Sequence, residues 1–234
     1  GNNRKAAEYS SSWEKTGDMP AALLPYAFNV LQSVPQDAVL LTNGEFDTFP
    51  LCQQQYANNV RPDVKLLCIS FAQKSSNRAM LFRNAGLTLP GNDSTSAFDA
   101  AFIMRVVSAN PGKKIYLAST VSGKILAALQ GDLYCTGLAF RYGDSPVNNL
   151  DFLKDNVGTK MDLACLSKPP ESKGVFDSNV SAQLNMNYVL PLTLAAKQYS
   201  LAGNTAKAEE LNALARSIGK AAGKEKTVNE LIGG

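Results

Sequence analysis

A short apolar run that ends in a polar turn constrains this chain more than any other feature. Residues Ala38 to Leu41 are all apolar, which is typical of a strand that is covered on both faces. The pair Asn43-Gly44 ends the run, since glycine can adopt a positive φ angle at little cost. A buried strand followed by a turn and a helix favours an α/β fold with crossover connections.

The residues after this turn predict the start of a helix. Asp47 is a good N-cap residue because its carboxylate can accept hydrogen bonds from the free amides of the first turn. Pro50 then falls in that turn, where its missing N–H costs little. Ligands of open α/β sheets bind outside the carboxyl ends of the strands. We therefore expect Asn43, Glu45, Asp47 and Thr48 at such a rim.

The two acidic residues of the turn support two interpretations. In the first, Asp47 only caps the helix and Glu45 is a solvated loop residue. In the second, Glu45 and Asp47 together bind a hard cation such as Mg²⁺ or Ca²⁺, or the hydroxyl groups of a sugar. Two acids separated by one residue form a weak metal-binding pattern, so no metal site is assigned.

Composition and charge exclude several classes of function. The length of 234 residues is enough for one large domain or for a domain plus an appendage, and 45% hydrophobic residues suit a globular core. The net charge of +3 does not indicate nucleic acid binding. The chain has no histidine, which excludes Ser-His-Asp and Cys-His catalysis and histidine zinc ligands. The four cysteines are widely spaced, which argues against a structural zinc site, and they are Cys52, Cys68, Cys135 and Cys165. The sequence indicates no cofactor.

Further apolar runs predict the rest of a parallel sheet. We expect strands at residues 64–70, 114–120 and 133–142, and helices at residues 20–33, 47–58, 75–84, 96–109 and 124–130. The predicted fold is α/β, a Rossmann-like, three-layer, mostly parallel sheet with strand order 2-1-3-4. Gly137 marks a bulge or a close approach inside the last strand.

This topology places a crevice between the first and third strands, where the connections diverge. Candidate ligand-binding residues share a position at strand ends, and they are Asn43, Glu45, Asp47, Thr48, Ser70, Ser119 and Thr120. Arg141, at the end of the fourth strand, is a further candidate that would face an anion, although a surface ion pair is the commoner role of such a residue. We assign no catalytic residue.

The last third of the chain predicts helices only. A long helix at residues 179–201, kinked at Pro191, is followed by the turn Gly203-Asn204 and a second helix at residues 205–218. This pair resembles one tetratricopeptide (TPR) unit. We therefore expect residues 1–167 to form an α/β domain that has a helix at its N-terminus. The region at residues 168–234 would begin with a linker at residues 168–173 and form a helical hairpin that packs on this domain.

Two motifs resemble the soluble C-terminal region of a family of bacterial multi-span membrane proteins, domain-of-unknown-function family 2723. Residues 37–51 are similar to the family pattern TNGDNDTFPLW, and residues 61–67 to its pattern RPDVRVV. This chain has Glu45-Phe46 where the pattern has Asp-Asn, and Cys52 where the family has an aromatic residue. The similarity in order and spacing covers most of the chain. The membrane part of the family is related to protein O-mannosyltransferases.

The resemblance implies an exported domain, periplasmic or in the cell envelope, whose signal or anchor would lie outside this sequence. We expect a non-catalytic binding or accessory domain that recognises a glycan or a polypeptide in a glycosylation or cell-envelope system, next to a membrane-anchored partner. One alternative is a carboxylate- or metal-dependent enzyme that acts on a sugar or phosphate through Glu45 and Asp47. The other is a structural scaffold that docks a partner on the C-terminal hairpin.

Overall fold

The computed structural model describes residues 3–91, 97–143, 148–167 and 175–233. Its backbone forms two compact units, which are interleaved along the sequence. The first unit contains residues 1–10, 34–134 and 139–147, and the second contains residues 11–33, 135–138 and 148–234. The boundary expected at residue 167 stays a prediction, and the expected linker at residues 168–173 lies outside the described residues.

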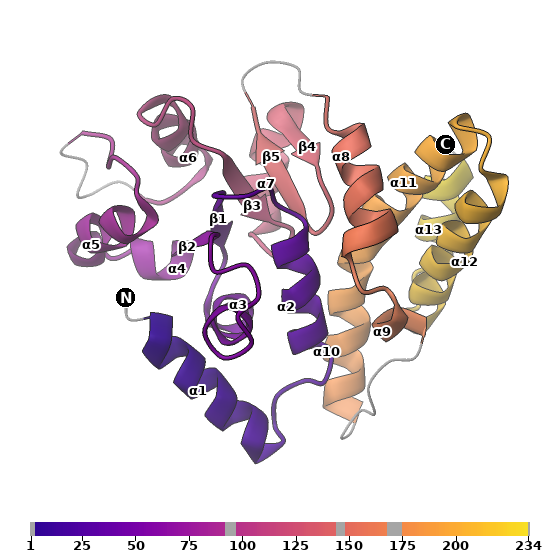
Figure 1. The fold of residues 1–234 in the computed structure, drawn as a ribbon, viewed down its shortest axis with the longest axis horizontal. Helices are drawn as coiled ribbons and strands as arrows, with labels where there is room; N and C mark the ends of the chain where they lie inside the picture. Colours follow the sequence, from indigo (N-terminus) through magenta and orange to yellow (C-terminus); the bar gives the residue numbers. More distant parts are fainter. Residues whose placement is uncertain (1–2, 92–96, 144–147, 168–174, 234) are drawn as a thin grey trace. The chain divides into compact units, whose positions relative to one another are not determined.

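A five-stranded mixed sheet with the order β2-β1-β3-β5-β4 is the centre of the first unit (Figure 1). β1 runs parallel to β2 and to β3, whereas β3 and β5 are antiparallel. The central strands β1 and β3 are buried on both faces, as their continuous apolar sequences predict. The strands are β1 (Val39–Thr42), β2 (Lys65–Cys68), β3 (Ile115–Ala118), β4 (Leu133–Cys135) and β5 (Ala139–Tyr142).

The predicted order of the first three strands is confirmed, but the prediction for the fourth is wrong. Residues 133–142 form two short strands, β4 and β5, and the strand next to β3 is the antiparallel β5. The chain breaks at residues 136–138, where the hydroxyl of Ser33 accepts a hydrogen bond from the N–H of Leu138 at 2.8 Å. The Asn156 amide donates to the carbonyl of Thr136 at 2.8 Å. These side-chain contacts replace strand pairing within the break.

Gly137 lies at the centre of this break. Its φ of +138° is a conformation that residues with a side chain rarely adopt. A β-carbon there would lie 2.5 Å from the Oγ of Ser33 and 2.5 Å from the Cε of Met161. The predicted close approach at this glycine is confirmed, and it turns the chain between β4 and β5.

The remaining elements of the first unit are helices and one short turn. α6 begins at Ala100 because the carboxylate of Asp99 accepts a hydrogen bond from the N–H of Phe102 at 2.9 Å. The guanidinium of the buried Arg78 lies 4.8 Å from the centre of the Phe102 ring. The helices are α1 (Asn3–Thr16, which continues into the second unit), α3 (Glu45–Tyr56), α4 (Ile69–Ala72), α5 (Ser75–Ala85), α6 (Ala100–Ser108) and α7 (Gly123–Leu129), and the short turn η1 (Gln130–Asp132) precedes β4.

The described part of the second unit is helical apart from its short loops. Asn29 of α2 organises its interior, because its side-chain amide donates to the hydroxyl of Tyr188 at 2.8 Å and to the carbonyl of Asp162 at 2.8 Å. The ring of Tyr26 packs edge-on against that of Tyr188, with 5.6 Å between their centres. The first helices are α2 (Leu23–Gln32), α8 (Leu150–Asp155), η2 (Asn156–Lys160) and α9 (Ala164–Ser167).

The C-terminal hairpin is present, but its first helix is divided. The single helix predicted at residues 179–201 is two helices, separated by a tight turn at Met186–Tyr188. Pro191 explains the division, because it cannot donate a hydrogen bond to residue 187 and its ring crowds that carbonyl. Asn204 caps the next helix by accepting from the N–H of Lys207 at 3.1 Å, which confirms the predicted turn. The helices are α10 (Val175–Asn185), η3 (Met186–Tyr188), α11 (Val189–Leu201), α12 (Thr205–Ala221) and α13 (Glu225–Gly233).

Candidate functional site

The acidic turn after β1 is held together by the carboxylate of Asp47. Its Oδ1 accepts a hydrogen bond from the N–H of Gly44 at 2.8 Å, and its Oδ2 accepts from the N–H of Asn43 at 2.8 Å. The prediction that Asp47 is the N-cap is wrong, because α3 already begins at Glu45 with Gly44 as the cap. Asp47 is the third helical residue and reaches back to the turn, which is the return half of a capping box.

Two other details of this turn also differ from the prediction. Gly44 has an extended backbone with a φ of −155°, so its freedom to adopt positive φ angles is not used. Pro50 lies in the second turn of α3 because the helix starts earlier than expected. There the Pro50 nitrogen cannot complete the helical hydrogen bond to the carbonyl of Phe46. The side chain of Phe46 is 63% exposed.

The same carboxylate also connects β1 to the end of β3. Its Oδ2 accepts a hydrogen bond from the hydroxyl of Thr120 at 2.6 Å. Beside it, the Oδ1 of Asn43 accepts from the N–H of Ser122 at 3.2 Å. The carbonyl of Asn43 accepts from the N–H of Ser70 at 3.0 Å, which adds the end of β2. The structure thus brings Asn43, Asp47, Ser70 and Thr120 together at the carboxyl ends of three parallel strands.

The other predicted residues have separate environments. Thr48 is buried, and its hydroxyl lies 2.6 Å from that of Thr42, so it points into the core. Glu45 is exposed to solvent on the first turn of α3. Arg141 is placed opposite Tyr116 by the antiparallel direction of β5, whereas Ala139 lies beside the carboxyl end of β3. Ser119, directly after β3, is partly exposed.

This arrangement limits the chemistry of the acidic turn. The Asp47 carboxylate accepts three hydrogen bonds from protein donors, which occupy most of its lone-pair directions. These three hydrogen bonds leave about one of the roughly four lone-pair directions, on Oδ1, for a contact with a ligand or a cation. Among the described residues, no group of three or more Cys, Asp or Glu side chains could hold a metal ion. The hydrogen bonds favour a structural role, in which Asp47 fixes the strand ends where the crossover connections diverge.

A concave surface lies at the C-terminal end of α3, next to β2, and the sequence did not predict it. This groove has a volume of about 900 Å³ and is called the β2 groove below. Its lining comes from α1, the end of α3, the loop before β2, β2 itself and α5, and the residues are Asn3, Arg4, Gln55, Tyr56, Asn59, Pro62, Val64, Lys65, Leu66, Met80 and Asn84.

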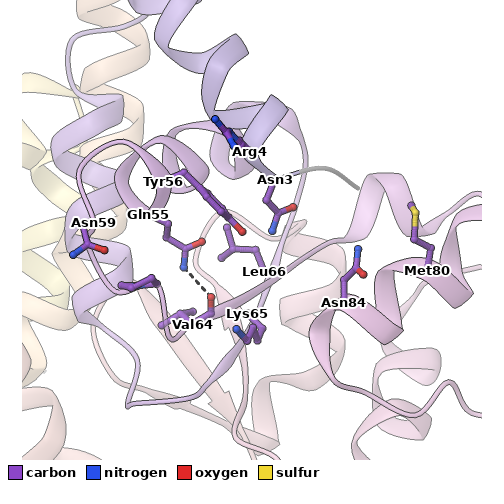
Figure 2. Close-up of a pocket in the computed structure, with 11 residues that line it drawn as sticks. Asn3, Arg4, Gln55, Tyr56, Asn59, Val64, Lys65, Leu66, Met80 and Asn84 are labelled. Atoms are coloured by element: carbon purple, nitrogen blue, oxygen red, sulfur yellow. Dashed lines mark hydrogen bonds between the residues drawn. The ribbon is translucent and has the colours of Figure 1, made fainter.

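The lining of the β2 groove combines amides, cations and exposed apolar side chains (Figure 2). Arg4 and Lys65 supply the positive charge, and none of the described residues that line the groove is an aspartate or a glutamate. The side chain of Tyr56 is 55% exposed and that of Met80 is 44% exposed. Such a surface can contact both the polar and the apolar parts of a ligand. Sequence reasoning missed the groove because its residues belong to several segments without a shared pattern.

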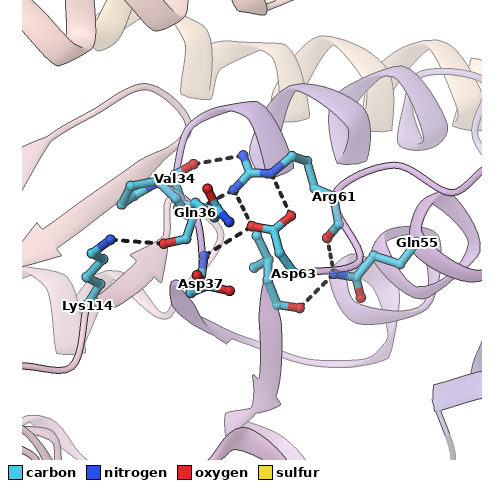
Figure 3. Close-up of polar contacts among 9 residues, drawn as sticks. Val34, Gln36, Asp37, Gln55, Arg61, Asp63 and Lys114 are labelled. Atoms are coloured by element: carbon cyan, nitrogen blue, oxygen red, sulfur yellow. Dashed lines mark hydrogen bonds and ion pairs between the residues drawn. The ribbon is translucent and has the colours of Figure 1, made fainter.

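The motif at residues 61–64 fixes one end of this groove (Figure 3). The guanidinium of Arg61 donates to the carbonyls of Val34 and Pro35, each at 2.9 Å, and forms an ion pair with Asp63 at 2.8 Å. The neighbouring guanidinium holds the pKa of the Asp63 carboxyl below its usual range. The side-chain amide of Gln55 donates to the carbonyls of Arg61 and Val64, each at 2.8 Å. The loop before β2 is therefore fixed by side-chain contacts.

A smaller apolar pocket of about 240 Å³ lies between α1, α3, α4, α5 and β2. Cys52 and Cys68 both line it, and both are free thiols. Burial raises the pKa of the Cys52 thiol to about 12, and the nearby Cys68 adds to the shift. At neutral pH the Cys52 thiol is therefore protonated and a poor nucleophile. The pocket can accept an apolar side chain.

Residues 24–81, about a quarter of the 234-residue chain, match a protein-family model described as TMEM260-associated domain 2. TMEM260 denotes a membrane protein family related to O-mannosyltransferases. The match confirms the coarser part of the resemblance inferred from the sequence, which is a similarity of residues 24–81 to a domain associated with such a membrane protein family. Comparisons with curated proteins and with solved structures give no significant match.

The matched segment contains the acidic turn, the motif at residues 61–64 and most of the lining of the β2 groove. It includes β1, α3, β2 and α4 in full. None of the helices within the described ranges has the length and the apolar composition needed to cross a membrane.

Proposed function

We propose that this chain is a non-catalytic binding domain of an exported cell-envelope system related to protein glycosylation, and that it recognises a polypeptide or a glycan. The observation that carries the proposal is the β2 groove, whose lining lies mostly inside the segment that matches the TMEM260-associated family. Its volume of about 900 Å³ is in the upper part of the range of ligand sites.

The composition of the groove supports binding of a polar polymer. Asn3, Asn59 and Asn84 supply amides that can both donate and accept hydrogen bonds. The exposed ring of Tyr56 offers an apolar face to a sugar ring or a side chain. In contrast, the rim after β1 has its central carboxylate engaged by protein donors. We therefore place the binding function at the groove and a structural function at the rim.

Binding is tested by screening the purified domain against a glycan array, a peptide array and a set of lipid-linked and nucleotide-linked sugars. The reversed charge in Lys65→Glu should abolish the hits that use the groove, because Lys65 is an exposed cation of its lining. Lys124→Glu makes the same charge change on α7 and serves as the control. No hit in any class, or hits that both variants retain, would contradict the proposal.

The exported location, the membrane-anchored partner and the relation to family 2723 are parts of the same proposal. They are supported by the similarity of residues 37–51 and 61–67 to that family and by the TMEM260-associated match. Fractionation of cells that carry the native gene should place the protein in the periplasm or the envelope. Recovery from the cytoplasmic fraction would contradict this part of the proposal.

We also propose a finer description of the fold. The strand order β2-β1-β3 supports a Rossmann-like, three-layer arrangement, and the adjacent helices α11 and α12 support a TPR-like hairpin. An experimental structure of the domain tests both assignments, and helices on a single face of the sheet would contradict the three-layer arrangement.

A metal-dependent or carboxylate-dependent enzyme at Glu45 and Asp47 is a weaker candidate. The exposed position of Glu45 favours it, but the three hydrogen bonds to Asp47 do not. Calorimetric titration with Mg²⁺ and Ca²⁺ decides between an enzyme site and a structural turn at Glu45 and Asp47. Heat of binding that Glu45→Gln removes would support an enzyme site, whereas no heat is the expected result.

A scaffold function of the C-terminal hairpin is favoured by one observation in the second unit. A pocket of about 460 Å³ lies between α11, α12 and α13, and Leu231 in its lining is 47% exposed. Leu231→Asp should disrupt a complex formed on this surface, which size-exclusion chromatography with the purified partner would detect.

A further inference from the structure

We propose that the β2 groove binds an extended, acidic polypeptide segment, which pairs as an additional strand with the outer edge of β2. This inference rests on the binding function proposed above and specifies its ligand. β2 is suited to this role because, among the described strands, it lies at the edge of the sheet and pairs with β1 alone. Adding a strand to such an edge is a common mode of peptide recognition.

The register of β2 shows which backbone groups face the groove. The N–H of Lys65 donates to the carbonyl of Ala38 at 2.8 Å, so the backbone of Lys65 is directed toward β1. In a parallel ladder alternate residues are directed to opposite sides, so the backbone groups of Leu66 and Cys68 are directed away from β1. Leu66 lines the β2 groove. Its N–H and carbonyl therefore lie where a strand in the groove can reach them.

A side chain already occupies one position of this outer edge in the way that a strand would. The carbonyl of Val64 is directed away from β1, and it accepts a hydrogen bond from the side-chain amide of Gln55 at 2.8 Å. The same amide group donates to the carbonyl of Arg61 at 2.8 Å. Gln55 thus closes the edge at its start. The next outward-directed position is Leu66, which lines the groove and is 8% exposed.

The charge of the groove selects an acidic segment. Among the described residues that line the groove, the charged ones are Arg4 and Lys65, and both are cations. Arg4 is paired with Glu8 at 3.5 Å, but both side chains are highly exposed, so this pair holds Arg4 only weakly. Lysine on an edge strand also discourages pairing with neutral or basic strands. An acidic segment is attracted to Arg4 and Lys65 and can therefore pair with the outer edge of β2, whereas these cations disfavour pairing with neutral or basic strands.

Apolar contacts complete the groove. The side chains of an added strand alternate between its two faces. One set would contact the exposed ring of Tyr56 and the thioether of Met80, which line the groove from α3 and α5. The other set would carry the carboxylates. The preferred ligand therefore alternates apolar and acidic residues.

The probe is a fluorescent peptide of about ten residues, the upper length of common strands, that alternates valine with glutamate. Its counterpart with lysine in place of glutamate has the same strand propensity and the opposite charge. Fluorescence anisotropy should detect binding of the acidic peptide and little or no binding of the basic one. Equal binding of the two peptides would overturn the charge selection.

Backbone pairing is tested on the peptide, so that folding of the domain is not affected. N-methylation of every second residue removes one set of alternate N–H groups, and a second peptide is methylated on the other set. Each peptide carries valines at one set of positions and glutamates at the other. Strand addition predicts that methylation of the set facing β2 weakens binding by at least about tenfold more than methylation of the other set. Equal effects of the two methylated peptides would overturn strand addition.

Variants of the domain provide the complementary test. Leu66→Pro removes the outward N–H without removing a hydrogen bond to β1, and Leu66→Ala removes a similar part of the side chain but keeps that N–H. The acidic peptide should bind Leu66→Ala at least about tenfold more tightly than Leu66→Pro. Should Leu66→Pro fail to fold, Lys65→Glu compared with Lys124→Glu decides the location, since only the first should weaken binding.

The outcomes separate this inference from the proposed function. Glycan binding that Lys65→Glu abolishes, without binding of either peptide, would overturn strand addition and leave a binding domain. Absence of peptide binding and of glycan binding would overturn both. Peptide binding that depends on the methylated set and on Lys65 supports both.

Discussion

Single residues in this protein show what a local sequence pattern does and does not determine. Gly137 is a glycine inside an apolar run, and this pattern indicates a bulge or a close approach. The structure confirms a close approach, with Ser33 and Met161 where a side chain would lie. The pattern did not show that the glycine divides the run into β4 and β5. That result depends on Ser33 and Asn156, which are far away in the sequence.

Gly137→Ala should destabilise the protein by about 1–3 kcal/mol, because the added methyl group overpacks the site at a positive φ. Equilibrium denaturation with urea measures the change. Gly131→Ala is the matched control, since a β-carbon at Gly131 would meet no atom within 4 Å. An equal effect of the two substitutions would contradict the close packing seen at Gly137.

The acidic turn shows the same division between pattern and tertiary contact. The position of Asn43, Asp47 and Thr120 at the carboxyl ends of the strands follows from the order of the strands. The hydrogen bonds that engage Asp47 depend on where the helix begins. That start differs by two residues from the sequence-based prediction. A difference of this size is ordinary for helix ends, but here it turns a predicted cap residue into a residue that connects β1 to β3.

At the scale of elements, β1 and the end of β3 should be coupled through Asp47 and Thr120. Thr120→Val removes the hydroxyl that donates to Asp47 at 2.6 Å and should cost about 1–3 kcal/mol of unfolding free energy. Thr120→Ser keeps a hydroxyl and should cost less. In a double-mutant cycle, Thr120→Val should cost clearly less in the Asp47→Asn background. Strict additivity would show that the two side chains do not interact.

The loop before β2 makes the stability depend on pH through Asp63. The pKa of Asp63 is lowered in the folded state, with the hydrogen bond from Arg61 as the largest cause. A lowered pKa contributes stability above the unfolded value of 3.8, and this contribution is lost as the pH falls through the folded value. Asp63→Asn should therefore reduce the stability at pH 6 more than at pH 2.5.

Urea denaturation of both proteins across this pH range measures the effect. The side chain of Asp63 is about a quarter exposed, which keeps the expected difference modest. A constant difference between the two proteins from pH 6 to pH 2.5 would show that the ion pair with Arg61 does not contribute.

The strand order illustrates how far element patterns can be used. The order β2-β1-β3 was predictable, because a strand, a helix and a second strand within a short length form a right-handed parallel unit. The direction of β5 was not, because an apolar run does not distinguish one strand from two strands joined by a tight turn. The division between α10 and α11 was partly predictable, since Pro191 gave the signal but not the place where the helix would break.

At the scale of the whole molecule, the sequence indicated a sheet and a group of helices but missed the surface on which we place function. The β2 groove is formed by residues from α1, α3, β2 and α5, which no motif connects. The motif at residues 61–64 carries part of the family resemblance, and its physical role is to fix the loop before β2. A basic residue on an exposed edge strand was the available signal for the groove, and Lys65 is such a residue.

One measurement tests the central claim, that ligands bind along β2 and the acidic turn is structural. It is a titration of the isotope-labelled domain with the acidic peptide, followed through the backbone amide signals in NMR spectra. We predict shifts at residues 55–59 and 64–68, which line the groove or adjoin it, and little change at residues 43–48 and 119–122. Shifts concentrated at residues 43–48 and 119–122, with the signals along β2 unchanged, would contradict the claim.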